Sequence, residues 1–472
     1  MIDTMKNEKK NILGYAPINT LLKMFAGPAI ISMVANALYN IVDQIYIGNS
    51  VGYLGIAATT VAFPIVTIVM ALGTLLGVGG SALAAIKLGE EKKKDAEEIL
   101  NSMLLVGCIG SAVLTIIGLL FLTLVITAFG ATDQTLLYSK QYGGVMIAIA
   151  PISTIIGILC NMARTDGSPQ LAMRALVGGV LANVILDPIF IFIFHWGVLG
   201  AALATAASQI FSAIVLAWYF KCRGRMRFNY EDFIHPNRPL IKRAMAIGAS
   251  SCLVQLSSTV LQILMNNSLL YYGNLSSVGG DVAIGAVGIV MKINMVFISV
   301  AIGIGIGAQP IIGFNKGAEQ YDRVLATYKL AVKCATTVTT VGWLCCMLMP
   351  HIILKIFGSS SAPGFLDFAT DAMRWFLGAV FVAGFQIIST GYFQATGQPF
   401  KASALSLMRQ FILLVPLILI LPMYFGLYGI IYAGTVADVI AAAIIVVFMH
   451  KEIHKLKALI AAGKSSLAIK AE

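Results

Sequence analysis

Two acidic side chains, Asp43 and Asp187, stand inside apolar runs of this sequence. Asn183 precedes Asp187 by four residues, so an amide and a carboxyl group share one face of a helix. Pro188 follows directly and has no N–H, so the carbonyl of Val184 loses its helical partner. Carboxylate, amide and carbonyl oxygens therefore gather at one level, and such oxygens can bind a proton or a hard cation.

Asp43 ends a polar stripe that lies on one face of a helix in an otherwise apolar run. The stripe consists of Ser32, Asn36, Tyr39, Asn40 and Asp43. A corresponding stripe follows 223 residues later and consists of Gln255, Thr259, Gln262 and Asn266. An amide replaces the acid in the second stripe, so only one half of the chain carries a titratable group at this level.

Three interpretations of the two acids remain open from the residues alone. They could form a structural hydrogen-bond network, a proton site shared by two nearby carboxylates, or a sodium site. A short turn at 195–197 places Thr205 and Gln209 near the depth of Asp187, so Thr205 could add a hydroxyl oxygen. The residues alone leave these three interpretations open, and they predict no cofactor other than a coupling proton or sodium ion.

The composition requires a membrane protein, because 58% of the 472 residues are hydrophobic and only 11% are charged. Twelve apolar runs are long enough to span a bilayer. They lie near 21–47, 54–86, 99–127, 140–163, 170–194, 197–220, 240–272, 282–314, 325–350, 368–395, 402–422 and 427–449. The sequence therefore predicts an all-α integral membrane protein with twelve transmembrane helices.

The net charge of +11 is a topology signal, which argues against nucleic acid as a partner. With a cytoplasmic N-terminus, 26 lysines and arginines fall on the inner side and two on the outer side. We expect a multi-pass protein of the cell membrane with both termini in the cytoplasm and anionic lipid headgroups as partners. Within the spans, the role of Lys292 stays open between a fixed counter-charge and a structural partner.

The chain repeats itself at a shift of about 229 residues. GVGGSALAAIKLGE from Gly77 matches GIGAQPIIGFNKGA from Gly305, and RTDGSP at 164–169 matches QATGQP at 394–399. Parallel repeats of six spans are typical of transporters. We predict an N-terminal lobe at 1–220, a cytoplasmic linker at 221–239, a C-terminal lobe at 240–450 and a cytoplasmic tail at 451–472.

The sequence resembles the multidrug and toxic compound extrusion (MATE) transporters. LYNIVD of the first span, ANVILDPIF of the fifth, ARTDGSP and the twofold repeat carry the resemblance, which points to the DinF branch and its MepA-like exporters. It implies two pseudo-symmetric six-helix bundles around a V-shaped central cleft. It also implies a cation-coupling site in the N-terminal lobe, formed by Asp43, Asn183, Asp187, Thr205 and Tyr142.

The resemblance and the polar stripes together suggest which side chains face the substrate. The expected cleft residues are Met33, Asn36, Tyr39, Asn40, Gln255, Gln262, Met265, Asn266 and Met291. Flexible methionines and aromatic faces suit many ligand shapes.

We expect a monomeric secondary exporter that carries amphipathic, often cationic drugs by alternating access, driven by protons or sodium. A lipid or lipid-linked oligosaccharide flippase is the alternative, although it would need a more cationic cavity. A membrane-embedded enzyme would need paired catalytic groups. Asp43 and Asp187 could mimic an aspartyl dyad, but the acid motifs of such enzymes are missing, so we predict no enzymatic activity.

Overall fold

The structure is a computed structural model that describes residues 12–51, 53–129, 131, 135–229, 233, 236–357 and 365–462. Helices form every regular element of these residues, as the sequence predicts. A bilayer core offers no water to unpaired backbone groups, so helices satisfy the backbone of each span internally.

The first half of the chain forms one run of helices. They are η1 (Ile12–Gly14), α2 (Ile18–Val51), α3 (Tyr53–Gly89), α4 (Lys93–Leu120), α5 (Leu122–Ala128), α6 (Leu136–Ala148), α7 (Ala150–Thr165), α8 (Pro169–Pro188), the π-helix η2 (Ile189–Ile193) and α9 (Gly197–Cys222).

The second half repeats this run. Its helices are α11 (Arg238–Asn274), α12 (Gly280–Gly317), α13 (Tyr321–Leu348), α14 (Pro350–Phe357), α15 (Phe365–Phe376), η3 (Val380–Val382), α16 (Ala383–Ala395), α17 (Pro399–Leu407), the π-helix η4 (Met408–Leu414), α18 (Val415–Phe425) and α19 (Leu427–Ala461). The last helix continues past residue 450, where the lobe was expected to end, and residues 463–472 of the expected tail lie outside the described residues.

The number of spans agrees with the sequence. Ten helical segments of the described residues are long and apolar enough to cross a membrane. Two further pairs, α6 with α7 and the α15 segment with the η3–α16 segment, qualify together and bend by 49° and 41°. With each bent pair counted as one span, the chain has the twelve spans that its hydropathy predicts.

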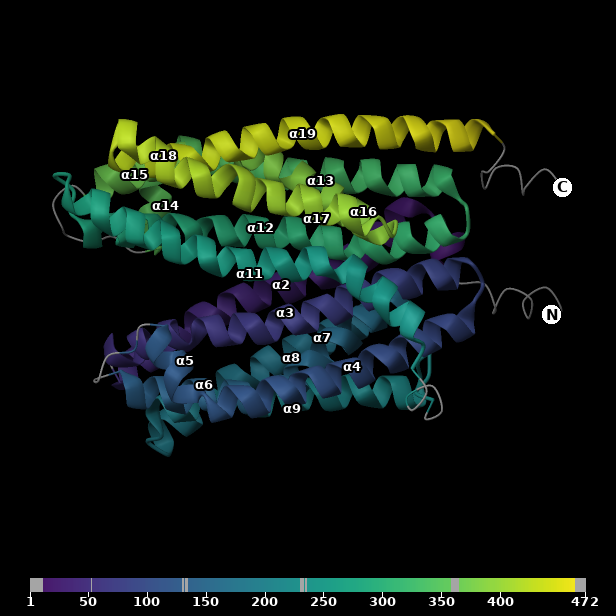
Figure 1. The fold of residues 1–472 in the computed structure, drawn as a ribbon, viewed down its shortest axis with the longest axis horizontal. Coiled ribbons are helices and arrows are strands. Elements are labelled where there is room, and N and C mark those ends of the chain that lie inside the picture. The colour runs from purple at the N-terminus through teal and green to yellow at the C-terminus, as the bar shows by residue number, and fades with distance from the viewer. Residues whose placement is uncertain are drawn as a thin grey trace.

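Figure 1 shows most helices of the first half gathered in one bundle and those of the second half, from teal α11 to yellow α19, in another. The start of α2 packs in the core of the second half. Along the seam between the bundles, α3 packs on α11 and α2 packs on α12. Each bundle has a buried apolar core, such as the cluster around Leu100 and Phe220 in the first half. The cluster around Phe368 and Ile430 belongs to the second half.

Glycines bring the two bundles into backbone contact near the basic end, where Lys87, Lys92, Lys93 and Lys94 flank the turn after α3 and Lys316 and Arg323 flank the turn after α12. A Cβ atom added to Gly248 of α11 would lie 1.9 Å from the carbonyl oxygen of Leu75 in α3. At Gly89 it would lie 1.9 Å from the oxygen of Phe314. The seam is therefore closed at the basic end, and it tolerates no side chain at these positions.

The linker between the bundles is fastened to the first half. The carboxylate of Asp166, in the turn before α8, accepts hydrogen bonds from the backbone N–H groups of Arg225 (2.8 Å) and Met226 (2.9 Å). It also accepts one from the hydroxyl of Tyr219 (2.7 Å). The start of the expected linker therefore belongs structurally to the first bundle.

Candidate cation site and substrate-facing residues

Four helices of the first half bring the predicted cation residues together. Asp43 comes from α2, Tyr142 from α6, Asn183 and Asp187 from α8, and Thr205 from α9. Asp43 is 7% exposed, Asn183 is 1% exposed and Asp187 is fully buried. α2 packs against α8, so Asp43 lies on the helix next to the one that carries Asn183 and Asp187.

A chain of hydrogen bonds joins Asp187, Asn183, Thr205 and Tyr39. The amide nitrogen of Asn183 donates to Asp187 Oδ1 (3.2 Å) and to the hydroxyl oxygen of Thr205 (3.3 Å). The hydroxyls of Tyr39 and Thr205 share a further hydrogen bond of 3.1 Å. The one-turn spacing of Asn183 and Asp187 along α8 makes the first of these contacts possible.

Three buried oxygens of the cluster have no hydrogen-bond partner among the described residues: Asp43 Oδ1, Asn183 Oδ1 and Asp187 Oδ2. Buried polar atoms are normally paired, so such orphans need an explanation. Two ionised carboxylates in one buried site also repel each other. A proton or a hard cation would satisfy both requirements, and the carboxylate, amide and hydroxyl oxygens present fit sodium.

The backbone changes its hydrogen-bond pattern just beyond Asp187. Pro188 ends α8, and residues 189–193 form the π-helix η2, in which the N–H of Phe194 reaches back to the oxygen of Ile189 (3.0 Å). Proline cannot donate to the carbonyl one turn earlier, which favours such a local rearrangement. The site therefore lies where α8 is least regular.

Apolar side chains surround the cluster and limit the access of water. Tyr142 packs against Ile47, Ile191 and Val198 on one side. On the other side it packs against a second cluster around Met146. In this low-dielectric setting, a single bound positive charge interacts strongly with the carboxylates.

The second half also buries an acid in a span, but this acid has a cationic partner. Asp438 of α19, which aligns with Gln209 at a shift of 229, forms an ion pair with Arg409 of η4 (2.5 Å). The backbone oxygen of Asp438 accepts a hydrogen bond from Gln386 (2.7 Å). This acid already has a cationic partner, whereas Asp43 and Asp187 have no salt bridge to any described Lys or Arg.

The expected cleft residues fall into three groups. Asn36, Gln262, Asn266 and Met291 are exposed, and Met33 and Gln255 are half-buried. Met265 is only 5% exposed, and it packs in the apolar core of the second bundle. The side chain of Asn40 lies outside the described part of the structure.

Two residues have contacts that the sequence does not suggest. Tyr39, expected in the cleft, shares a hydrogen bond with Thr205 of the cation cluster. Gln209, one helical turn beyond Thr205, accepts a hydrogen bond from the hydroxyl of Ser153. Helical spacing defines which residues share a face, but the rotation of each helix in the bundle depends on tertiary packing. No sequence signal would have separated Tyr39 from its neighbours on the stripe.

No cluster of three or more His, Cys, Asp or Glu side chains that could hold a transition metal occurs in the described residues. The cation cluster has only two such groups, with amide and hydroxyl oxygens beside them. Its chemistry therefore suits a proton or an alkali cation better than zinc or iron.

Comparisons with known proteins agree with this architecture. The MatE family model matches residues 28–189 and 248–420, one segment in each half. Multidrug export protein MepA of Staphylococcus aureus is 25% identical over 450 residues, which cover 95% of this chain and 97% of the relative. The protein of the same description from Staphylococcus saprophyticus is 26% identical over 459 residues, with the same coverage of both chains.

Solved structures show the same fold. An outward-facing multidrug resistance MATE family transporter of the MOP superfamily aligns with a TM-score of 0.88 and 24% identity, over 95% of this chain and 99% of that one. A MOP superfamily transporter from Pyrococcus furiosus aligns with the same TM-score and identity, over 94% and 98% of the two chains. With the twelve-span repeat and the family match in both halves, this chain is a member of the MatE family, a multi-pass membrane transporter and not an enzyme.

Proposed function

We propose that this transporter exports amphipathic, often cationic drugs from the cytoplasm across the cell membrane in exchange for protons or sodium. The export of drugs rests on the relatives named as multidrug export proteins, which align over nearly their whole length. The coupling rests on one observation: three buried oxygens of Asp43, Asn183 and Asp187 lack partners among the described residues, while Asp438 of the second half is paired with Arg409.

In this proposal the coupling ion binds between α2 and α8, with Thr205, Tyr39 and Tyr142 around it. Ion binding removes the repulsion between the two acids and favours one packing of α2 against α8. Drug binding favours the other packing, so the two ligands compete through the difference in their affinities for the two states. The irregular backbone after Pro188 is where α8 can change its path most easily.

The protein acts in this proposal as a monomer with both termini in the cytoplasm. Its basic turns contact anionic lipid headgroups, as the charge distribution of the sequence suggests. A lipid flippase is less well supported, because Arg409 is already engaged by Asp438 and cannot freely serve a pyrophosphate.

Transport into proteoliposomes tests the proposal. Proton and sodium gradients are imposed separately, and ethidium movement is followed by fluorescence. We expect Asp187→Asn and Asp43→Asn each to reduce gradient-driven transport by about tenfold or more, since a coupling free energy of this size links the two ligands. Asp367→Asn, which neutralises an exposed acid of α15, is the matched control and should transport normally. Normal transport by both site variants would show that these acids do not couple.

A further inference from the structure

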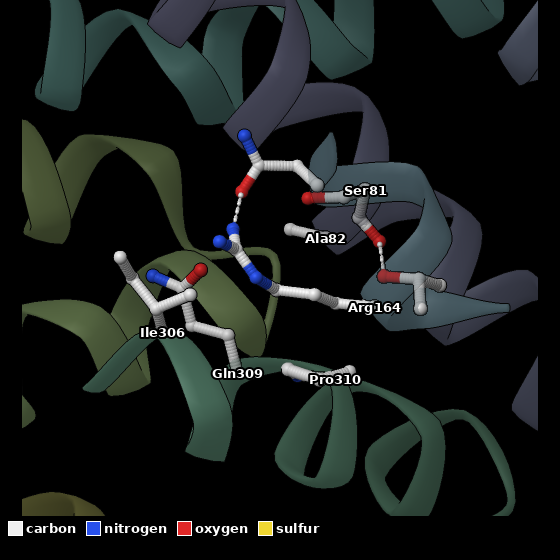
Figure 2. A pocket seen from close by; sticks show the side chains of 8 residues that line it. Ser81, Ala82, Arg164, Ile306, Gln309 and Pro310 are labelled. Atoms are coloured by element: carbon white, nitrogen blue, oxygen red, sulfur yellow. Dashed lines mark hydrogen bonds between the residues drawn. The ribbon is translucent and has the colours of Figure 1, made fainter. Parts of the chain in front are cut away.

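Arg164, in the last turn of α7, is a buried cation at the seam between the bundles. It is only 4% exposed. Its side chain faces a small pocket to which α3 and α7 of the first half and α12 of the second half contribute. The lining residues are Ser81, Ala82, Asn161, Arg164, Thr165, Ile306, Gln309 and Pro310. Figure 2 shows the guanidinium group reaching into the space in front of Gln309 and Ile306.

The charge of Arg164 is not balanced by a described acid. Its guanidinium donates one hydrogen bond, to the amide oxygen of Asn161 (3.1 Å), and no salt bridge of the described residues includes it. Asp166, two residues away, is occupied by Tyr219 and the linker backbone. A buried charge without a partner is strongly unfavourable, so a negatively charged group next to this guanidinium would be stabilising.

The corresponding position in the second half has no charge. Arg164 aligns with Gln394 at a shift of 230. The amide of Gln394 donates to the hydroxyls of Ser250 (2.6 Å) and Ser251 (2.7 Å) and accepts a hydrogen bond from Gln309 (3.2 Å). A glutamine therefore meets the structural needs of this place, and the positive charge of Arg164 needs another explanation.

We propose that a small inorganic anion of the chloride type binds in this pocket, between Arg164 of the first half and Gln309 of the second. Gln309 uses one of its two amide protons for Gln394, and the other is available to an anion. Because the lining comes from both halves, the site is complete only when the seam is closed at the basic end. Anion binding therefore stabilises this closed state, whichever cation or drug the protein carries.

The pocket favours a single-atom anion over a phosphate group of a lipid. Arg164 is the only basic residue in its lining, and the remaining side chains are small or neutral. Phosphate recognition normally uses several cationic groups or a row of backbone N–H donors. Chloride, or bromide as its probe, needs only a few N–H donors around a compact space.

The distance between the two bundles at the basic end shows whether the anion stabilises the closed state. Spin labels are attached at Lys221→Cys of α9 and Lys455→Cys of α19, both exposed, in a variant without native cysteines. Distances are recorded in nanodiscs with sodium chloride, sodium bromide or sodium gluconate at equal ionic strength. We expect the ratio of closed to open molecules to be about tenfold higher in chloride and bromide than in gluconate, with saturation as the halide rises.

Two substitutions separate the site from general salt effects. Arg164→Gln installs the residue of the second half and should remove the difference between halide and gluconate. Arg174→Gln removes an exposed charge of α8 and should preserve it. If Arg164→Gln fails to fold, Arg164→Lys retains the charge and should keep a weaker, still saturable halide response. Equal distances in all three salts for the unaltered pocket, or a full halide response in Arg164→Gln, would overturn the proposal.

Discussion

Asp187 and Asp438 are both buried acids of a membrane span, but only one of them has a cationic partner. Arg409 neutralises Asp438, whereas Asp187 accepts a hydrogen bond from the amide of Asn183 and forms no salt bridge with a described residue. An acid with a permanent counter-ion is a structural element, and an acid without one can exchange a proton or an ion. The two halves of the repeat thus use the same kind of side chain for different purposes.

The paired acid should matter for stability. Asp438→Asn leaves the guanidinium of Arg409 without its counter-ion, so we expect the free energy of unfolding to fall by about 2 kcal/mol or more. The double variant Arg409→Leu/Asp438→Leu should recover part of this loss because neither charge remains. Unfolding in detergent, followed by circular dichroism, gives both values. An unchanged midpoint in Asp438→Asn would show that the pair is not needed for stability.

Glu90, in the turn after α3, should make the basic end sensitive to acid. Burial alone would raise its pKa, but hydrogen bonds from Lys87 (3.0 Å) and Lys92 (3.1 Å) outweigh burial and hold the pKa of Glu90 below its usual value. A lowered pKa means that this stabilisation is present above the usual value and is lost as the pH falls through the lowered one. Glu90→Gln should therefore flatten the dependence of Tm on pH between about 6 and 3, whereas Glu91→Gln, at an exposed position, should not.

At the scale of helices, the contact of α3 with α11 depends on glycine. The carbonyl oxygen of Leu75 lies 1.9 Å from where the Cβ atom of Gly248 would be, and backbone cannot give way as a flexible side chain can. We expect Gly248→Ala to disfavour the closed seam by about 1–3 kcal/mol, the usual cost of overpacking. The spin-label pair at 221 and 455 would report a larger open fraction.

A matched glycine provides the control for this experiment. A Cβ atom at Gly288 of α12 meets nothing within 4 Å, so Gly288→Ala should leave the distances unchanged. If Gly248→Ala also left them unchanged, the seam would have to close in some way that does not need this backbone contact.

At the scale of the whole molecule, hydropathy and repetition predict most of the architecture. Each span is a long apolar run, and a helix pairs all of its backbone groups within the span, so the twelve spans follow from composition. The pairing of Asn183 with Asp187 follows from helical spacing along α8. The burial of Arg164 could not be predicted, because a basic residue at a helix end is usually exposed and the packing of α12 beside it is a tertiary feature. The burial of Met265 likewise depends on how α11 is rotated in its bundle.

The orientation of the molecule can be tested with a thiol reagent that does not cross membranes. Cys222 ends α9 at the basic end, and Leu275→Cys follows α11 at the opposite end; both positions are exposed. In single-cysteine variants on intact cells, we expect Leu275→Cys to react and Cys222 to react only after permeabilisation, because basic turns stay in the cytoplasm. Reaction of Cys222 on sealed cells would reverse the orientation.

The contact of Gly89 with the second half has a symmetry-related counterpart. Gly89 approaches Phe314 and Ala318, and Gly317 approaches Ile86 and Glu90. A shift of 228 residues converts one contact into the other, so a patch of the repeat packs against its own duplicate, as in a twofold-symmetric dimer. A half-length ancestor carrying that patch would have been able to associate with a second copy of itself, and duplication of its gene would then have joined two partners already shaped for each other.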